Sequence, residues 1–333
     1  MVTLKEIAEA AGVSVMTVSR VINNVPAKVS EETRARIMDI ISERGYVPNS
    51  FARSLSSRSS RLVALVANGG NNVLRSPYSA SMVGHISSFV QERGFSLMLF
   101  TVDDDYEDVT RRLRTWNVAG AIFLGLFDSA LKRIRKDNQI PLVFTDSYST
   151  ERQLTNVGID DYHGGEIAAK HLIDNGHTKL AFVGRSAESP VLRERMRGFM
   201  DACQERGVTL LEERTLPDNP PADEIERVLL KASDPPTGVF ATSDFVALQI
   251  ISVLSDHGLR VPEDISVMGF DNLELGAISR PKLTTIKQDI EKKAQLAVEL
   301  LFEHIQKPGT PAQNMILDVF LVERASVGRL KNT

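Results

Sequence analysis

The sequence lacks the features that mark a secreted or membrane-embedded protein. Its only cysteine among 333 residues, Cys203, cannot form an intrachain disulfide or supply a thiolate metal site, so we interpret it as a packing residue. No apolar run approaches the roughly 20 residues that cross a bilayer. The N-terminal segment MVTLKEIAEA has acidic residues where a signal peptide would have a basic patch and an apolar core. We therefore expect a soluble, cytoplasmic protein.

The residue patterns of metal sites and of common enzyme classes are missing as well. His163, His171 and His177 are too widely spaced to bind a metal from one helix face. Gly69 and Gly70 follow an apolar run, but no third glycine completes a dinucleotide-binding loop. No Ser/His/Asp set has supporting local sequence. We expect a protein that is not an enzyme and that needs no metal and no cofactor.

The composition is that of a globular protein whose charge is unevenly distributed. Hydrophobic residues make up 42% and charged residues 25%, and at about 150 residues per domain the length suggests two sizeable domains with room for a small third. The net charge is -4, yet residues 1–61 hold nine Lys and Arg against six Asp and Glu. A basic N-terminal segment on an acidic body fits a polyanionic partner at that end only.

The first 45 residues contain three segments with the apolar spacing of short helices. Gly12 and Gly45 suit the turns that end the first and third helices, and Ser14 and Ser30 are typical caps of the second and third. The residues expected to face inward are Leu4, Ile7, Ala8 and Ala11, then Val18, Val21 and Ile22, then Ile37, Ile40 and Ile41. Two helices joined by a short turn with glycine, and braced by a third helix, form a helix-turn-helix.

From Arg61 onward, short apolar runs alternate with amphipathic stretches of helical length. We expect strands over 62–67, 95–101, 121–126 and 141–145, with helices over 81–93 and 106–116. After Asp161 we expect strands over 180–184, 239–242 and 265–270, with helices over 165–175, 193–206, 222–231 and 244–257. This alternation of strands and helices predicts an α/β protein with two doubly wound parallel sheets that form two lobes. Because ligands of such sheets bind beyond the carboxyl ends of the strands, the cleft between the lobes is the expected ligand site.

Several long segments carry a specific family resemblance. They are VTLKEIAEAAGVSVMTVSRVIN at 2–23, VSEETRARIMDIISERGYVPN at 29–49, ARSL at 52–55, VPEDISVMGFDN at 261–272, LTTIKQD at 283–289 and VERAS at 322–326. Together they closely resemble the lactose-repressor (LacI/GalR) family of bacterial transcription factors. The resemblance implies a helix-turn-helix domain over 1–48, a hinge helix and linker over 49–60, and an effector-binding and dimerisation core over 61–333.

The same resemblance implies the arrangement of the core. It should resemble a periplasmic sugar-binding protein, with two lobes joined by three crossings of the chain. One lobe would take 62–160 and about 291–320, and the other 161–289 and about 321–330.

In the head, the resemblance assigns DNA contacts to the second helix. Val15 and Met16 match the base-reading pair of the family, and Arg20 matches a third reader. Because Val15 and Met16 have no polar groups, they imply contact with thymine methyls or with groove shape; the alternative is that they simply pack. Phosphate contacts are expected from hydroxyl side chains nearby. The full set that we expect to contact DNA is Ser14, Val15, Met16, Thr17, Ser19, Arg20, Asn23, Asn49, Ala52, Arg53 and Leu55.

The hinge set lies in residues 48–55, which predict a helix of about two turns with Asn49 as its cap. A helix of this length is marginal in isolation. In the family, two such helices pair in the minor groove, and the position matching Leu55 wedges between base pairs while Ala52 permits close approach. A flexible serine-rich linker is the alternative, and both can hold if the helix forms only on DNA.

In the core, polar residues at strand ends match effector-contact positions of the family. Asp146 and Asp271 end apolar strands, and Arg195 lies near the start of a helix. Such groups can hydrogen-bond the hydroxyls of a sugar-like ligand. For one carboxylate alone, a loop cap or surface charge is the better interpretation, whereas three groups at matching ends favour a ligand site. The full expected set is Asn68, Tyr78, Asp146, Arg195, Ser243, Asp244 and Asp271, and the stretch 216–221 lacks the stacking aromatic that relatives often present there.

These features together predict a sequence-specific transcriptional regulator, with a repressor as the first expectation. We expect a homodimer on near-palindromic double-stranded DNA, with no membrane partner and with a small-molecule effector, a sugar or sugar derivative, between the lobes. Only Arg329–Thr333 follow the last expected strand, so the heptad helix that makes some relatives tetramers is not expected. The alternatives are a purine or other non-sugar effector, regulation by a co-repressor and, more remotely, a transport-type sugar-binding protein.

Overall fold

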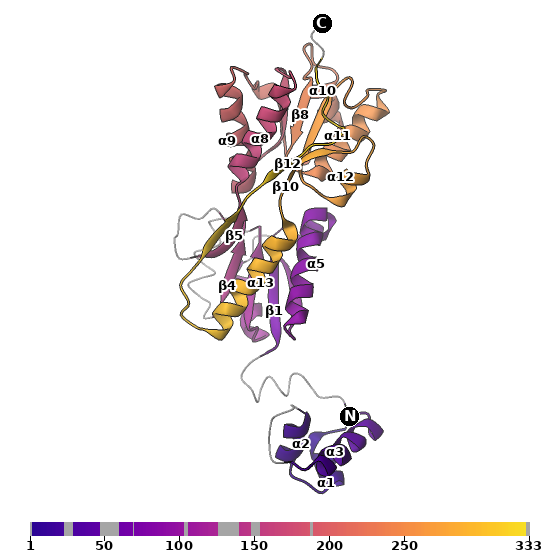
Figure 1. Cartoon of the computed structure of the whole chain (residues 1–333), viewed down its shortest axis with the longest axis vertical. Coiled ribbons are helices and arrows are strands. Elements are labelled where there is room, and N and C mark those ends of the chain that lie inside the picture. Colours follow the sequence, from indigo (N-terminus) through magenta and orange to yellow (C-terminus); the bar gives the residue numbers. More distant parts are fainter. Residues whose placement is uncertain are drawn as a thin grey trace. The chain divides into compact units, whose positions relative to one another are not determined.

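The computed structural model describes residues 2–22, 29–46, 60–68, 70–102, 106–125, 140–147, 154–186 and 189–330. The chain divides into two compact units, residues 1–60 and residues 61–333 (Figure 1). Within the described ranges, no helix is long and apolar enough to cross a membrane. The same ranges hold no cluster of three or more His, Cys, Asp or Glu side chains that could bind a metal ion.

The first unit contains the three expected helices, α1 (Leu4–Ala11), α2 (Val15–Ile22) and α3 (Glu31–Glu43). Thr3 and Glu6 form a capping box at the start of α1, and Gly12 adopts φ 63° in the turn that follows. Ile7, Val18 and Ile37 are fully buried at the centre of a small core. The helical spacing therefore identified the correct inward face, although the three isoleucines 22, 40 and 41 are only half-buried at its edge.

The second unit begins with a parallel sheet, which with its helices we call the N-lobe. Its strand order is β11-β5-β4-β3-β1-β2. The strands are β1 (Leu62–Asn68), β2 (Ser96–Val102), β3 (Gly120–Leu124), β4 (Leu142–Thr145), β5 (Thr155–Ile159) and β11 (Asn314–Leu317). Helices α5 (Pro77–Glu92) and α13 (Ile290–Gln306) share a core cluster with one sheet face, and α6 (Tyr106–Thr115) with the other. A short 3-10 helix, η1 (Gly70–Arg75), precedes α5.

The second sheet and its helices form the C-lobe. The strand order of this sheet is β12-β10-β9-β8-β6-β7. β12 is antiparallel to β10, and every other pair of neighbouring strands in the sheet is parallel. The strands are β6 (Leu180–Arg185), β7 (Thr215–Pro217), β8 (Gly238–Ala241), β9 (Ser266–Asp271), β10 (Thr284–Lys287) and β12 (Phe320–Val322). The helices are α8 (Asp161–Asp174) and α9 (Pro190–Glu205) on one face, α10 (Ala222–Leu229) and α11 (Asp244–Asp256) on the other, and the short α12 (Glu274–Ile278) and η2 (Glu212–Arg214). The expected α/β class with two doubly wound sheets is confirmed.

The chain passes between the lobes three times: from β5 into α8, from β10 into α13, and from β11 into β12 (Figure 1). The helix α13 therefore follows a strand of the C-lobe but packs in the core of the N-lobe. Residues 288 and 289, between β10 and α13, form a short link that connects one sheet directly to the other lobe.

Helices α8 and α9 touch through their backbones at two glycines. A Cβ atom on Gly165 would lie 2.0 Å from the carbonyl oxygen of Arg195, and one on Gly198 would lie 1.9 Å from that of Tyr162. No side chain other than hydrogen fits at either position. This contact fixes α9, and with it Arg195, against the start of α8.

Candidate functional site

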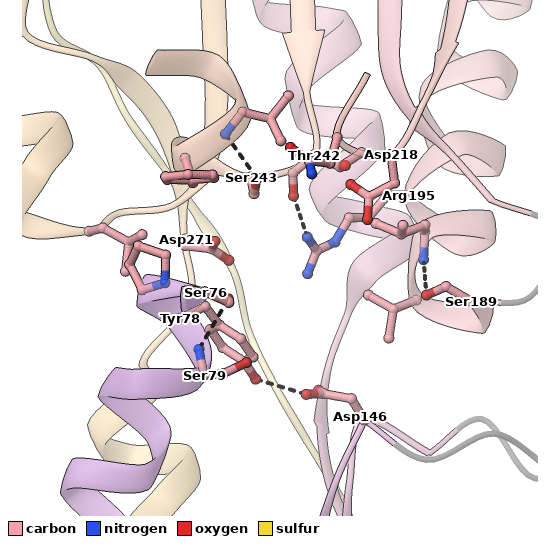
Figure 2. A pocket seen from close by; sticks show the side chains of 18 of the residues that line it. Ser76, Tyr78, Ser79, Asp146, Ser189, Arg195, Asp218, Thr242, Ser243 and Asp271 are labelled. Carbon is pink, nitrogen blue, oxygen red and sulfur yellow. Dashed lines mark hydrogen bonds between the residues drawn. The ribbon is translucent and has the colours of Figure 1, made fainter. Parts of the chain in front are cut away.

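A cavity of about 730 Å³ lies at the carboxyl ends of the strands of both lobes. It has the size and the mixed polar and apolar lining of a small-molecule site. Its polar lining comes from Arg75, Ser76, Tyr78, Ser79 and Asp146 of the N-lobe, from Ser189, Arg195, Asp218, Asn219, Thr242, Ser243, Gln249 and Asp271 of the C-lobe, and from Gln288 between them. Figure 2 shows that side chains of both lobes converge on this space.

Arg195 is the anchored cation of the C-lobe wall. Its Nε donates to Asp161 Oδ1 at 2.7 Å, and its Nη1 donates to the carbonyl oxygen of Thr242 at 2.6 Å. The guanidinium carbon lies 3.5 Å from the ring centroid of Phe270. The ion pair and the stacking fix the plane of the guanidinium, whose free edge points into the cavity (Figure 2). This geometry can donate two parallel hydrogen bonds to a ligand.

Asp146 comes from the opposite wall, directly after β4. Its backbone has φ 56°, an uncommon value for a residue with a side chain. Its Oδ2 accepts from the Tyr78 hydroxyl at 2.9 Å, and its Oδ1 accepts from Lys293 Nζ at 2.8 Å. Burial, together with the nearby Asp146 carboxylate, raises the pKa of Tyr78 well above its usual range, so the hydroxyl keeps its proton and remains a donor.

Asp271 ends β9 with φ 116°, and Asn272 follows with φ 59°. Strained backbone of this kind costs about 1–3 kcal/mol per residue and is concentrated at functional sites. The Asp271 carboxylate is buried and accepts from Gln288 Nε2 at 2.6 Å. Burial raises its pKa to about 6, although Arg195, Gln288 and Lys293 favour the ionised form. It is therefore an acceptor at neutral pH that is held ready for a hydrogen-bond donor.

The structure places five of the seven expected effector residues on the cavity wall: Tyr78, Asp146, Arg195, Ser243 and Asp271. Asp244 is a correction. Its carboxyl group is fully buried behind the wall, where its oxygens lie within hydrogen-bond distance of the Leu273 N–H, at 2.7 Å, and of the Thr285 hydroxyl. As the first residue of α11, it turns back toward β9 and β10 instead of into the cavity. The side chain of Asn68 lies outside the described residues.

Sequence reasoning missed several wall residues. Ser76 and Ser189 cap α5 and α9, and each stands directly before a proline. A serine followed by proline is typical of a helix start, so this pattern could have identified both residues as the beginnings of helices that border the cavity. Phe245, 40% exposed, supplies an aromatic surface from α11 in place of the one absent from 216–221. Thr242 Oγ1 and Gln249 Oε1 are buried wall atoms without a hydrogen-bond partner among the described residues. Unpaired buried oxygens are costly, and a ligand that donates hydrogen bonds would satisfy them.

In the first unit, the expected base-reading pair stands on the surface. Val15 is 43% exposed and Met16 63% exposed, whereas Val18 and Val21 form the buried face of α2. The packing alternative for Val15 and Met16 is therefore wrong. The remaining described members of the expected DNA set lie on or beside α2: Ser14, whose Oγ accepts from the Thr17 N–H at 3.1 Å, and Thr17, Ser19 and the exposed Arg20. Asn23, Asn49, Ala52, Arg53 and Leu55 lie outside the described residues.

Both the first unit and the unit that contains the cavity match known protein families. Residues 3–49 match the bacterial regulatory proteins of the lacI family, and residues 169–327 match the periplasmic binding protein-like domain. The HTH-type transcriptional repressor PurR of Aliivibrio salmonicida (strain LFI1238) is 32% identical over 340 residues, which cover 99% of this chain and 100% of that protein.

Two solved structures match almost the whole chain. The lac repressor dimer bound to operator and the anti-inducer ONPF is 27% identical, has a TM-score of 0.87, and matches over 98% of this chain and 99% of its own. The complex of the transcriptional regulator CelR with cellobiose is 30% identical, has a TM-score of 0.73, and matches over 98% of this chain and 100% of its own. On the strength of these matches, the chain belongs to the lacI family of bacterial regulatory proteins.

Proposed function

We propose that this protein is a transcriptional repressor that binds a near-palindromic operator as a homodimer and whose operator affinity depends on an uncharged sugar or sugar derivative bound in the cavity. As a member of the lacI family, it is a DNA-binding regulator and not an enzyme. The observation that carries the effector half of the proposal is the convergence of Asp146, Arg195 and Asp271 from two lobes on one cavity. We assign residues 1–48 to DNA binding, 49–60 to the hinge and 61–333 to effector binding and dimerisation. We place the protein in the cytoplasm, where a bacterial transcriptional regulator meets its operator.

The head supports DNA reading by apolar contact. Val15 and Met16 present exposed methyl groups at the start of α2, which is the position from which a recognition helix meets base edges. Arg20, one helical turn beyond Met16, can bridge two acceptors of a guanine. Two-fold symmetry of a dimer then requires paired half-sites, because one small head has too little contact area for tight binding.

The charges around the cavity support an uncharged effector. Asp146 is paired with Lys293 and Arg195 with Asp161, so both charges are already compensated within the wall. Within the described ranges, no ion pair involves the other two carboxylates of the wall, Asp218 and Asp271, or its exposed cation Arg75. Two unpaired carboxylates therefore stand against one unpaired cation. Unpaired carboxylates repel a phosphate and accept hydrogen bonds from hydroxyls. The relative CelR was solved with cellobiose, a sugar without charge.

A planar non-sugar effector is the second candidate, because Phe245 offers an exposed ring on the cavity wall. A thermal-shift screen distinguishes the candidates, since a ligand that binds only the folded state raises apparent stability with its concentration. The screen should contain uncharged sugars, nucleobases and nucleosides, and sugar phosphates. We expect uncharged sugars to raise the melting temperature, and stabilisation by sugar phosphates alone would contradict the proposal.

A variant of the cavity then links the ligand to DNA. Asp271→Ala should reduce the effect of the screened sugar on operator affinity, because the ligand loses its acceptor on the C-lobe while phosphate contacts of the head persist. The measurement is an operator titration with and without that sugar at one salt concentration. Asp256→Ala, at the exposed end of α11, is the matched control. A full wild-type response in Asp271→Ala would require the ligand site to lie elsewhere.

A further inference from the structure

Lys293 is a buried lysine that the ligand site alone does not explain. It lies in the first turn of α13 and is 1% exposed. Its Nζ donates to Asp146 Oδ1 at 2.8 Å, to the Tyr78 hydroxyl at 3.0 Å and to Gln288 Oε1 at 2.8 Å. An ammonium group has three N–H donors and no acceptor. Three acceptors around it therefore use all of its hydrogen-bonding capacity.

Gln288 extends this set of bonds to the other lobe. It lies in the link between β10 and α13, and its Nε2 donates to Asp271 Oδ1 at 2.6 Å. Because an ammonium only donates and a carboxylate only accepts, the amide of Gln288 can bridge them in one orientation only. A continuous series of hydrogen bonds thus runs from Tyr78 and Asp146 of the N-lobe, through Lys293 and Gln288, to Asp271 of the C-lobe.

These bonds tolerate little relative movement of the lobes. They measure 2.6–3.0 Å, and a displacement of the end of β9 from α13 by roughly 1 Å would break the link at Gln288. Lys293 lies where water has no access, so any acceptor that it loses leaves a buried charge poorly compensated. Networks of this kind are stable when complete and costly when partly broken, which favours one lobe orientation over its neighbours.

We propose that Lys293 is a positioning residue that holds the N-lobe and the C-lobe in the orientation described here and thereby keeps Asp146 and Asp271 directed at the same ligand. This role goes beyond the proposed function, because it operates without DNA and without effector. Removal of the ammonium should release the lobes even in the unliganded protein.

Distances between two spin labels, one on each lobe, test this directly. Native Cys203 is buried and its thiol has a pKa raised to about 12 by that burial, so it does not compete for the label. Labels are placed at Glu92→Cys on α5 and Gln204→Cys on α9, which are both exposed. Labelled chains are diluted with unlabelled chains, because the protein is proposed to be a homodimer and only distances within one chain are wanted.

Two lysine variants are compared in this labelled protein. Lys293→Met removes the ammonium with little change in length, and Lys292→Met removes the neighbouring exposed charge, whose Nζ contacts Gln295 at 3.3 Å. We expect one narrow distance distribution in the parent and in Lys292→Met, and a distribution about twice as wide in Lys293→Met. If the distributions of the two variants superimpose, the proposal is wrong, even if Lys293→Met melts at a lower temperature.

A second variant keeps the test decisive if Lys293→Met does not fold, as judged by circular dichroism. Lys293→Met combined with Asp146→Asn removes both members of the buried pair, so neither is left as a charge without its partner. A wide distribution in this double variant supports the positioning role, and a narrow one overturns it. Because neither operator nor effector is present in the experiment, its failure is distinguishable from a failure of the proposed function.

Discussion

Replacing Asp244 by Asn should remove a loss of stability that the wild-type protein suffers as the pH rises. The Asp244 carboxyl is fully buried, and burial, reinforced by Asp271, raises its pKa to about 8, although hydrogen bonds from Thr285 and the Leu273 N–H act in the opposite direction. In the unfolded chain the same group ionises near 3.8. The folded state therefore binds more protons between these two values, and the free energy of unfolding falls as the pH rises through that interval.

The magnitude follows from the size of this interval. Each pH unit below 8 costs about 1.4 kcal/mol, and the slope flattens above the folded-state pKa, so the loss between pH 6.5 and 8.5 is about 2 kcal/mol. This range avoids His171 and His177, whose pKa values burial lowers from 6.5. Those histidines add most of their stability below pH 6.5, and the remaining gain of about 0.4 kcal/mol each above it is the same in the wild type and in Asp244→Asn, so it cancels in the comparison of the two. The amide of Asn has the shape of a protonated carboxyl and does not titrate. Its oxygen can accept from the Leu273 N–H, and its NH2 group can donate to the Thr285 hydroxyl, which then becomes the acceptor.

The assay is urea unfolding followed by far-UV circular dichroism at pH 6.5, 7.5 and 8.5 and constant salt. Across the series the wild type should lose about 2 kcal/mol more than Asp244→Asn does. Asp256→Asn, at the exposed end of the same helix, should behave as the wild type does. If the curves for the wild type and Asp244→Asn run parallel, then burial does not hold a proton on Asp244, and the reasoning fails.

Three further variants test packing and DNA recognition. Gly198→Ala should destabilise the protein by about 3 kcal/mol in the same urea assay, because its Cβ would lie 1.9 Å from the carbonyl oxygen of Tyr162. Gly84→Ala is the control and should not destabilise the protein, because Gly84 lies in a helix with open space around its Cα. Arg20→Ala should relax the preference at one base pair of each half-site by about 1–3 kcal/mol, measured by competition among singly substituted operators. Leu55→Ala should weaken operator binding much more than binding to random DNA, and an equal loss on both would argue against a minor-groove wedge.

The sequence predicted the elements whose signal is local. Amphipathic helices such as α9 and long apolar strands such as β1 and β9 were found within a few residues of their bounds. The residue patterns did not predict β5, β7, β10, β11 and β12, because these strands are short and partly polar and form by pairing with other segments of the chain. The start of α8 was placed four residues late, since paired glycines disfavour helix by propensity and only the contact with α9 compensates.

The candidate site was predictable to the extent that it depends on strand ends. Asp146 follows a strand of one sheet and Asp271 ends a strand of the other, and ligands of such sheets bind beyond the carboxyl ends of the strands, so both residues could be placed at the cleft between the lobes without a structure. Lys293 could not be placed at the site from the sequence, because a lysine in an amphipathic helix normally indicates an exposed position. Its burial depends on an ion pair with Asp146, which is distant in the sequence. Asp244 was placed wrongly because strand-end position does not determine where the first side chain of the next helix points.

The backbone contact between α8 and α9 also bears on how this cavity could be altered by design. Since neither Gly165 nor Gly198 has room for a methyl group, substitutions at this contact cannot be used to reshape the α9 side of the cavity. The guanidinium of Arg195 is thus a fixed anchor around which other wall residues must be varied. Phe245, which stands exposed in the cavity, is the natural position to trim or exchange. A library that retains both glycines would sample new ligand sizes while leaving the anchoring cation where it is.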